Sequence, residues 1–272
     1  MAFDISNIVI NRPLRGIAFD DVGSILWTVD QIKDPSLTMS SEKVTAADAL
    51  GVPIMEFERS KSCEFSATQA VFDLGLLAAQ SGTSKEVATA ENNIVVPMWE
   101  TVKVTAEQTS ITLKQTPNEG SMPYIWELKA DRSLSTRYIE ADAASETEFQ
   151  LVGNTLTLPN RAEGDTAART YLIPYEYTAT GAAGLGAVKV TNAADKFATA
   201  SKFVLKCLGH NVCDKTTEYA IWLIFDNAKL SSDFDLTLTP EMEQQFSMTI
   251  MTNYCDENKP LFSIIMPEAA AE

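Results

Sequence analysis

The stretch Phe246-Ser-Met-Thr-Ile250 alternates large apolar residues with small polar ones. This is the period of a β-strand that buries one face and exposes the other to water. The same alternation recurs along most of the chain, in segments 102–104, 111–113, 149–151, 156–158, 171–177, 203–207 and 234–238. The sequence therefore predicts a mainly β protein whose sheets each carry one apolar face.

Two positions refine the predicted strands. Gly153 and Asn154 stand between two alternating segments, and both tolerate a positive φ angle, so Val152–Thr155 is expected to form a two-residue hairpin turn. Pro174 lies inside another alternating segment and has no N–H to donate. It therefore predicts a sheet edge or a β-bulge at that point.

Residues 66–80 switch from the strand period to the helical one. Six apolar residues recur at helical spacing, namely Ala67, Ala70, Val71, Leu74, Leu77 and Ala78. Ser66 is a suitable N-cap and Gly82 a suitable stop. We expect an amphipathic helix over 66–80 that covers the open side of a curled sheet. Its polar face lacks the basic cluster typical of a membrane-surface helix.

A long polar segment, Ser40–Pro53, separates two short apolar strands at 37–39 and 54–57. Hairpin connections are usually about 2–5 residues long, and longer loops in compact domains are commonly functional. We therefore expect this segment to be a functional loop. Its candidate residues are Ser41, Glu42, Lys43, Asp48 and Gly51.

The chain is strongly acidic. Its 272 residues include 37 Asp and Glu against 21 Lys and Arg, which gives a formal net charge of −16. Such an excess repels nucleic acid phosphates at close range, which excludes a protein that grips DNA. A protein along which DNA must slide without sticking remains compatible with the same repulsion. One acidic stretch contains Glu140, Asp142, Glu146 and Glu148, a pattern usually typical of a solvated face.

No motif for catalysis, metal binding or a cofactor is evident. His210 is the sole histidine; Cys207 and Cys213 bracket it, but a fourth ligand and a C-x-x-C pair are missing. With Cys63 and Cys255 the chain has four cysteines, which are too few and too scattered for a disulfide framework. The glycine-rich segment 178–186 lacks the lysine and the strand–loop–helix context of a phosphate-binding loop. We expect a protein that is not an enzyme and holds no cofactor or metal.

Membrane insertion is not expected either. The longest apolar runs, 219–225 and 74–79, fall far short of the roughly 20 residues that span a bilayer. Residues 1–6 show no basic head followed by an apolar block, so no secretory signal is expected. Folding in a cytoplasm is therefore predicted.

Three stretches together resemble the tail tube proteins of tailed bacteriophages. The first is Pro35–Ser62, a strand, a long polar loop with a central glycine, and a return strand with basic residues near its end. The second is Phe65–Leu77, similar to the helix that follows in such proteins. The third comprises the strands 234–238 and 246–250, ending in Leu261-Phe-Ser-Ile-Ile265. The resemblance rests on patterns of residue type in these three stretches.

The resemblance implies a curled β-sandwich or barrel with one flanking helix, formed by residues 1–115 and 187–272. It implies that six copies join sheets edge to edge into rings, which stack into a hollow conduit for the genome. The loop at 40–53 would then reach the neighbouring ring. The chain is longer than many tube proteins, and we expect the extra length at 116–186 as an inserted β region or outer-surface region.

Within this reading the partners are further copies of the chain, other phage tail proteins and passing DNA. The protein would belong to the virion tail and be made and assembled in the host bacterial cytoplasm. The acids Glu140, Asp142, Glu146 and Glu148, or the loop acids Glu42 and Asp48, are expected to face the lumen or the ring junctions.

Two alternatives stay open. Another virion protein, of a capsid or its decoration, is one; a capsid protein of the common class needs a long spine helix, and only 66–80 has helical periodicity. A carbohydrate- or host-binding β-sandwich is the other, with sugar-stacking platforms supplied by tryptophans, namely Trp27, Trp99, Trp126 and Trp222. Tryptophans beside strand residues are more often core or interface anchors.

Overall fold

The computed structural model describes residues 7–213, 216–237, 239–240, 243–252 and 257–268. Cys255, Leu238 and residues 1–6, which entered the predictions above, lie outside these ranges. The chain is mainly β, as predicted, and divides into two compact units. The first comprises residues 1–85 and 190–272, and the second is Glu86–Lys189.

The first unit is built from one curled antiparallel sheet and a short helix. The order of its main strands is β2-β1-β14-β15-β17-β4-β3, with β16 added to β17 and β18 added to β15. The elements are β1 Ile8–Phe19, β2 Ile25–Asp30, β3 Ile32–Ala47, β4 Pro53–Gln69, α1 Leu74–Gln80, β14 Ala200–Asn211, β15 Glu218–Leu230, β16 Leu236–Thr237, β17 Glu243–Ile250 and β18 Ser263–Ile265.

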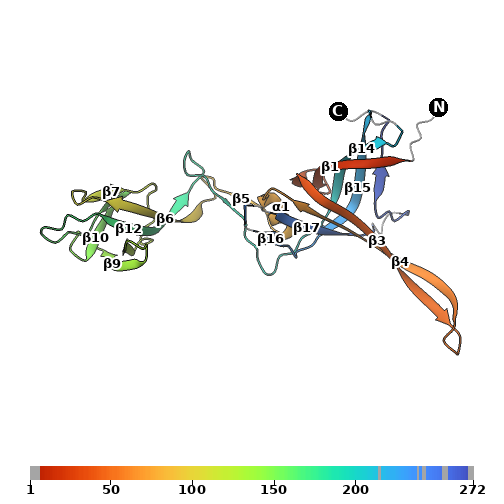
Figure 1. Ribbon diagram of the computed structural model, residues 1–272, viewed down its shortest axis with the longest axis horizontal. Coiled ribbons are helices and arrows are strands. Elements are labelled where there is room, and N and C mark those ends of the chain that lie inside the picture. The colour runs from red at the N-terminus through yellow and green to blue at the C-terminus, as the bar shows by residue number, and fades with distance from the viewer. Residues whose placement is uncertain (1–6, 214–215, 238, 241–242, 253–256, 269–272) are drawn as a thin grey trace. The chain divides into compact units, whose positions relative to one another are not determined.

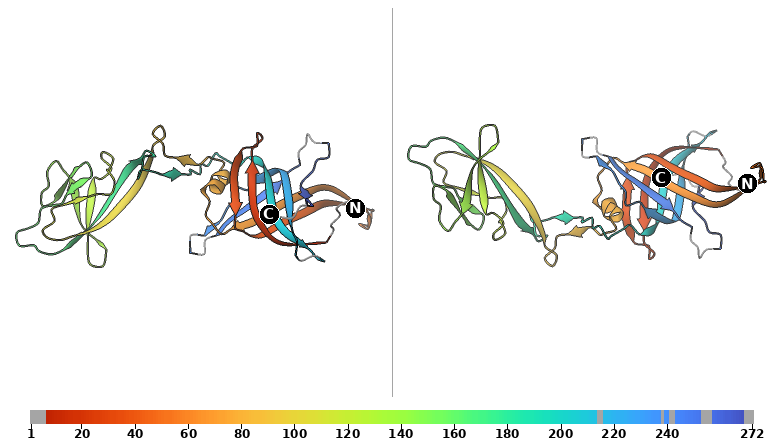
Figure 2. Two further views of the ribbon diagram at one scale, coloured as in Figure 1. Left: turned by 90° about the horizontal axis from the view of Figure 1, so that it is seen from above. Right: turned by 90° about the horizontal axis from the view of Figure 1, so that it is seen from below.

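Aromatic contacts across the core show how strongly this sheet curls. Trp27 on β2 stacks on Phe203 of β14, with ring centroids 5.2 Å apart. Trp27 also meets Phe246 of β17 edge-on at 6.2 Å, although β2 and β17 are four places apart in the strand order. The sheet therefore wraps around one core, as predicted, and Figure 2 shows this wrapping.

The helix is shorter than predicted. Residues 66–69 continue β4 and pair with β17, with Ser66 opposite Ser247 and Gln69 opposite Gln244. The helix begins at Leu74, with the Asp73 side chain accepting hydrogen bonds from the N–H groups of Gly75 and Leu76. The prediction of a start at Ser66 was wrong because residues 63, 65, 67 and 69 also fit a strand, and a paired neighbour on each side favours that choice. The stop at Gly82 agrees with its φ of +65° directly after the C-cap residue.

Two buried glutamines fasten the helix to the sheet. The side-chain oxygen of Gln244 on β17 accepts from the Asp73 N–H at 3.0 Å. Gln80, at the end of the helix, donates to the main-chain oxygen of Gln245 at 3.2 Å. Leu76 and Ala78 are buried on the same helix, with Leu76 in the core. The helix thus covers part of the curled sheet, close to β2.

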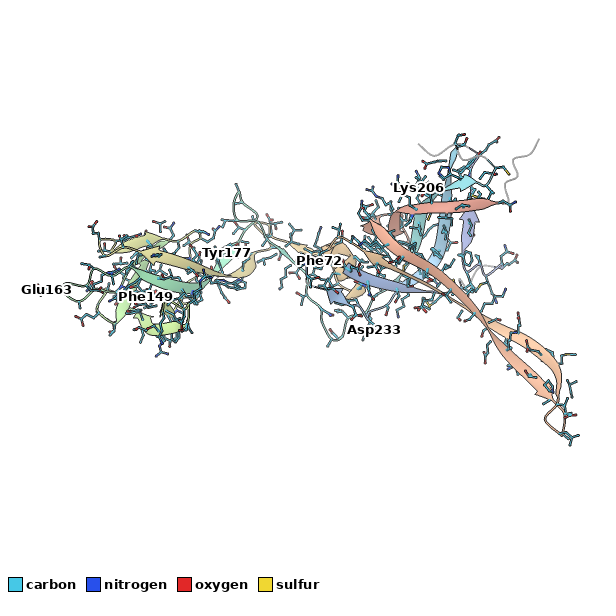
Figure 3. The ribbon with its side chains drawn as sticks, viewed as in Figure 1. Phe72, Phe149, Glu163, Tyr177, Lys206 and Asp233 are labelled. Atoms are coloured by element: carbon cyan, nitrogen blue, oxygen red, sulfur yellow. The ribbon has the colours of Figure 1, made fainter. Side chains whose placement is uncertain are left out.

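The second unit has a core of its own. Its seven-stranded sheet has the order β6-β12-β8-β9-β10-β11-β7, and β13 and β5 form a separate two-stranded ribbon. The elements are β5 Glu86–Val87, β6 Ile94–Val104, β7 Ser110–Thr112, β8 Tyr124–Leu128, β9 Leu134–Glu140, β10 Glu148–Val152, β11 Thr155–Thr157, β12 Arg169–Ala179 and β13 Val188–Lys189. Strand pairs are antiparallel except β9–β10. Phe149 is fully buried at the centre of this unit, and Glu163 lies in a loop at one end (Figure 3).

The boundaries of the second unit differ from those expected for the inserted region. The expected insertion, 116–186, starts later than the observed unit, because β6 and β7 belong to it as well. β6 pairs with β12 over its whole length, from Ile94 opposite Ala179 to Val104 opposite Arg169. A long-range pairing of this kind leaves no local mark in the sequence before β6.

This unit contains the predicted hairpin turn at residues 152–155 and Pro174, which was expected at a sheet edge or a β-bulge. Val152 pairs with Thr155, and Gly153 has a φ of +61°, which confirms the two-residue hairpin. Pro174 lies on β12, which is an interior strand instead of an edge. However, β8 pairs with β12 only at residues 170–172, so Pro174 lies past the end of that neighbour.

Candidate assembly surfaces

Strands β3 and β4 continue beyond the core as a two-stranded arm, residues 38–62 (Figure 1). Cys63 is the first core residue of β4, and every β4 residue before it, from Pro53 to Ser62, is exposed. A two-stranded ribbon alone in water is marginally stable at best. The arm is therefore a surface that a partner would stabilise.

The segment expected to be a loop is most of this arm. Pairing runs to Ala47 opposite Pro53, so the predicted loop at 40–53 is a strand, a short turn and the start of the return strand. The prediction of a loop was wrong because it relied on the alternation that marks a strand. That alternation arises only where one face of the strand is buried. Here both faces are in solvent, and the pairing rests on main-chain hydrogen bonds and cross-strand contacts.

The five candidate residues of the segment have different positions on the arm. Ser41, Glu42 and Lys43 lie on β3, and Lys43 Nζ forms an ion pair with Glu56 at 2.8 Å. Asp48 and Gly51 form the tip. The Asp48 carboxylate accepts from the N–H groups of Leu50 and Val52 at 2.9 and 2.8 Å, and Gly51 has a φ of +82°. The tip is thus a defined turn whose geometry favours those two residues.

The two faces of the arm differ in chemistry. Val44 pairs with Phe57 and Ala46 with Met55, so these four apolar side chains share one face. On the other face Thr45 pairs with Glu56 and Lys43 with Glu58. Phe57 is 48% exposed and Met55 56% exposed.

This apolar face was not predicted from the sequence. The feature of the sequence that indicates this face is the run Ile54-Met-Glu-Phe57, together with Val44 and Ala46, because it places apolar residues in and beside a polar segment. Exposed apolar patches on soluble proteins commonly mark interaction sites.

The curled sheet also has unpaired strand edges. β2 and β3 end the strand order. β2 pairs only with residues 15–19 of β1, so the first half of β1 has no neighbour on that side among the strands described. Val9 and Ile10 in that half are 60% and 56% exposed. Such edges present free main-chain donors and acceptors to another chain.

The four acids expected to face the lumen or the ring junctions lie where β9 ends and β10 begins in the second unit. Glu140 ends β9, Asp142 and Glu146 lie in the connection, and Glu148 begins β10. The parallel pairing of Phe149 with Glu140 brings these strand ends side by side. Ser145 Oγ donates to Glu148 Oε2 at 2.8 Å, and Glu140, Asp142 and Glu146 are exposed. The loop acids Glu42 and Asp48 lie on the arm of the first unit.

The segment around His210 is part of the sheet. Cys207 is buried on β14, where burial raises the pKa of its thiol to about 11, and Cys213 is exposed. His210 Nε2 lies 3.4 Å from a Glu218 carboxylate oxygen across the β14–β15 pair. Among the residues described, no group of His, Cys, Asp and Glu is arranged to hold a metal ion. No helix in the described ranges is long and apolar enough to cross a membrane.

A curled sheet with a covering helix, open strand edges and a projecting amphipathic arm defines a β-rich protein that exposes apolar side chains away from its cores. The chain belongs to the YomU/Tube protein family, whose model matches residues 18–260. This is a phage tube-type family, in agreement with the resemblance to tail tube proteins, and it makes the protein a structural component of the phage tail. No curated protein sequence matches the chain.

Proposed function

We propose that the protein is a non-enzymatic tail tube subunit. Copies join through their sheet edges into rings of six, and the rings stack into a hollow conduit through which the phage DNA passes. The subunit would be made and assembled in the host cytoplasm and would contact other tail proteins at the tube ends. The ring number rests on the resemblance to tube proteins alone.

The observation that carries the proposal is the arm at residues 38–62. Its apolar face contains Val44, Ala46, Met55 and Phe57, with no core of its own to cover them. A second copy in an adjacent ring would cover this face and stabilise the ribbon. Burial of apolar surface contributes about 25 cal/mol per Å², so four such side chains can supply a substantial part of a ring-to-ring contact.

The strand edges support association within a ring. A strand at a free edge pairs readily with another chain, and a closed ring uses both edges of every subunit. The exposed Val9 and Ile10 on the open half of β1 would be covered by the same contact. The arm and the edges thus offer two directions of growth, which a stacked ring requires.

Assembly can be tested by negative-stain electron microscopy of the purified protein at rising concentration. Hollow tubes or rings of uniform diameter, with a mass of six subunits per ring, would support the proposal. Monomers or irregular aggregates at every concentration, also in the presence of the tail components that start assembly, would contradict it.

The acidic excess supports passage of DNA without adhesion. Two sets of acids are candidates for the lumen. The first is Glu140, Asp142, Glu146 and Glu148 in the second unit, and the other is Glu42 and Asp48 on the arm of the first unit. Reversal to Lys of each set in separate phages distinguishes them, and the set that lines the lumen should slow genome ejection while tubes stay intact. In the arm, Glu42→Lys is the informative change, because Asp48 holds the turn. Unchanged ejection for both sets would overturn the lubrication idea.

A further inference from the structure

The outer face of the sheet in the second unit carries aromatic side chains that its core does not use. Trp99 on β6 pairs with Pro174 on β12, and Trp126 on β8 pairs with Leu172 two residues away on the same strand. These four side chains therefore lie on one face, opposite the core residues Tyr171, Ile173 and Tyr175. Trp99 is 70% exposed.

A shallow groove of about 300 Å³ runs along this face. Its walls include Trp99, Tyr124 and Trp126 together with Pro97, Pro123 and Pro174. The volume is at the low end for small-molecule sites. A specific protein–protein interface buries a much larger surface area than a groove of this size offers. Pro97 also removes a main-chain donor from β6, the edge strand of this sheet, which disfavours a partner that adds a strand there.

The charge of the face points to an uncharged ligand. The Arg137 guanidinium lies over the Tyr124 ring, 4.6 Å from its centroid, and the exposed Glu176 lines the same groove. Of the residues that line or cover the groove, Glu176 and Arg137 supply one charge of each sign, whereas Lys103 lies four residues from Trp99 on the same face of β6. The Arg137 and Glu176 side chains can hydrogen-bond to hydroxyls without requiring a charged partner.

We propose that this face binds a neutral oligosaccharide, with pyranose rings stacked on Trp99 and Trp126. A pyranose ring presents a face of C–H groups, which packs on an indole ring, and a rim of hydroxyls, which the Arg137 and Glu176 side chains bind. The two tryptophans are two strands apart and offset by two residues along the strands, roughly 12 Å from the strand spacing and the rise per residue, so they suit two rings of one chain better than a single sugar. The other tryptophans do not serve, since Trp27 is in the core and Lys206 lies over the Trp222 ring.

Each site would bind weakly, because the groove is shallow and small. Repetition along an assembled tube would raise the overall affinity without any new contact, and this step alone rests on the proposed assembly. The single-site property belongs to the isolated full-length chain and does not depend on tube formation.

Isothermal titration of the full-length protein with cellohexaose, chitohexaose, maltohexaose and a proline-rich peptide tests the proposal. We expect saturable millimolar binding of at least one hexasaccharide. Trp99→Ala should weaken it about tenfold, the scale of an aromatic contact, while Phe197→Ala, an equally exposed aromatic of the first unit, should leave it unchanged.

Three results would overturn it. These are no binding of any hexasaccharide, binding of the peptide alone, and hexasaccharide binding that Trp99→Ala leaves intact. Circular dichroism of the variant controls for folding, and Trp126→Ala provides a second, independent change on the same face.

Discussion

The arm of the first unit and the sheet of the second unit differ in where their polar groups find partners. On the arm, ion pairs and apolar side chains remain in solvent, as at Lys43–Glu56 and Phe57. In the second unit, polar groups are satisfied inside. The buried Glu100 accepts from the Tyr175 hydroxyl at 2.6 Å and from the Lys114 N–H at 2.8 Å.

A second internal cluster surrounds Arg169. Its guanidinium forms ion pairs with Asp165 and Glu127 and donates to the Tyr138 hydroxyl at 3.2 Å. Burial and the neighbouring Glu127 raise the pKa of Tyr138 far above the usual phenol range. The second unit satisfies these polar groups by itself, whereas the arm exposes apolar side chains that, in the proposed assembly, another copy of the chain covers.

Removing the apolar face of the arm should have the largest effect. Met55→Glu together with Phe57→Glu places charges where a partner must bury side chains, so rings or tubes should no longer form. Negative-stain microscopy measures this, and circular dichroism should show an unchanged β spectrum. The matched control, Glu56→Gln with Glu58→Gln on the opposite face, should still assemble. Tubes formed by the doubly charged variant would remove the arm from the account.

A cavity in the second core should act on that unit alone. Phe149→Ala is expected to cost about 3–5 kcal/mol, the usual range for deleting a fully buried phenylalanine side chain. Calorimetry should show the transition of the second unit at a lower temperature and that of the first unit unmoved. Phe225→Ala in the first core should produce the reverse pattern. A single transition that both variants shift together would show that the two units do not unfold independently.

The glutamine contacts of α1 should have a moderate effect. Gln244→Ala removes the acceptor of the Asp73 N–H and a neighbour of the buried Gln80, and unsatisfied buried groups cost about 1–3 kcal/mol. Urea unfolding should show this loss in the first unit. Gln245→Ala, whose side chain points away from these contacts and whose main chain alone binds Gln80, is the control. Equal losses in both variants would contradict the proposed contact.

The smallest effect concerns pH. Hydrogen bonds from the Ala167 N–H and from Arg169 hold the pKa of Asp165 below its usual value. The interactions that lower the folded-state pKa favour the ionised carboxylate. Their contribution to the free energy of unfolding is therefore complete above about pH 4 and is lost as the pH falls through the folded-state pKa. Asp165→Asn should therefore be less stable than the wild type near neutrality, and the difference should vanish in acid. The exposed Glu163→Gln is the control, and a difference independent of pH would refute this assignment.

The sequence predicted features that depend on local chemistry or on one buried face. Alternation located strands such as 246–250 and 203–207, and two residues tolerant of positive φ located the turn at 153–154. The prediction from the sequence was wrong where pairing with distant strands decided the structure. Residues 66–69 fit both periods, and pairing with β17 made them a strand.

The candidate surfaces were predicted less well than the strands. The segment 40–53 was recognised as unusual by its length, but its pairing as a ribbon and its apolar face depend on contacts across β3 and β4. The exposure of Trp99, against the burial of Trp27, likewise depends on which sheet face meets a core. Neither can be read from residue type alone.

The proposed assembly requires that the apolar face of the arm contacts another copy of the chain. A photoreactive amino acid at Phe57, activated under assembly conditions, tests this directly, with the same group at the exposed Val152 of the second unit as control. We expect cross-linked dimers from position 57, with the attachment point in another subunit. Rings or tubes that assemble while position 57 yields no intermolecular product would contradict it.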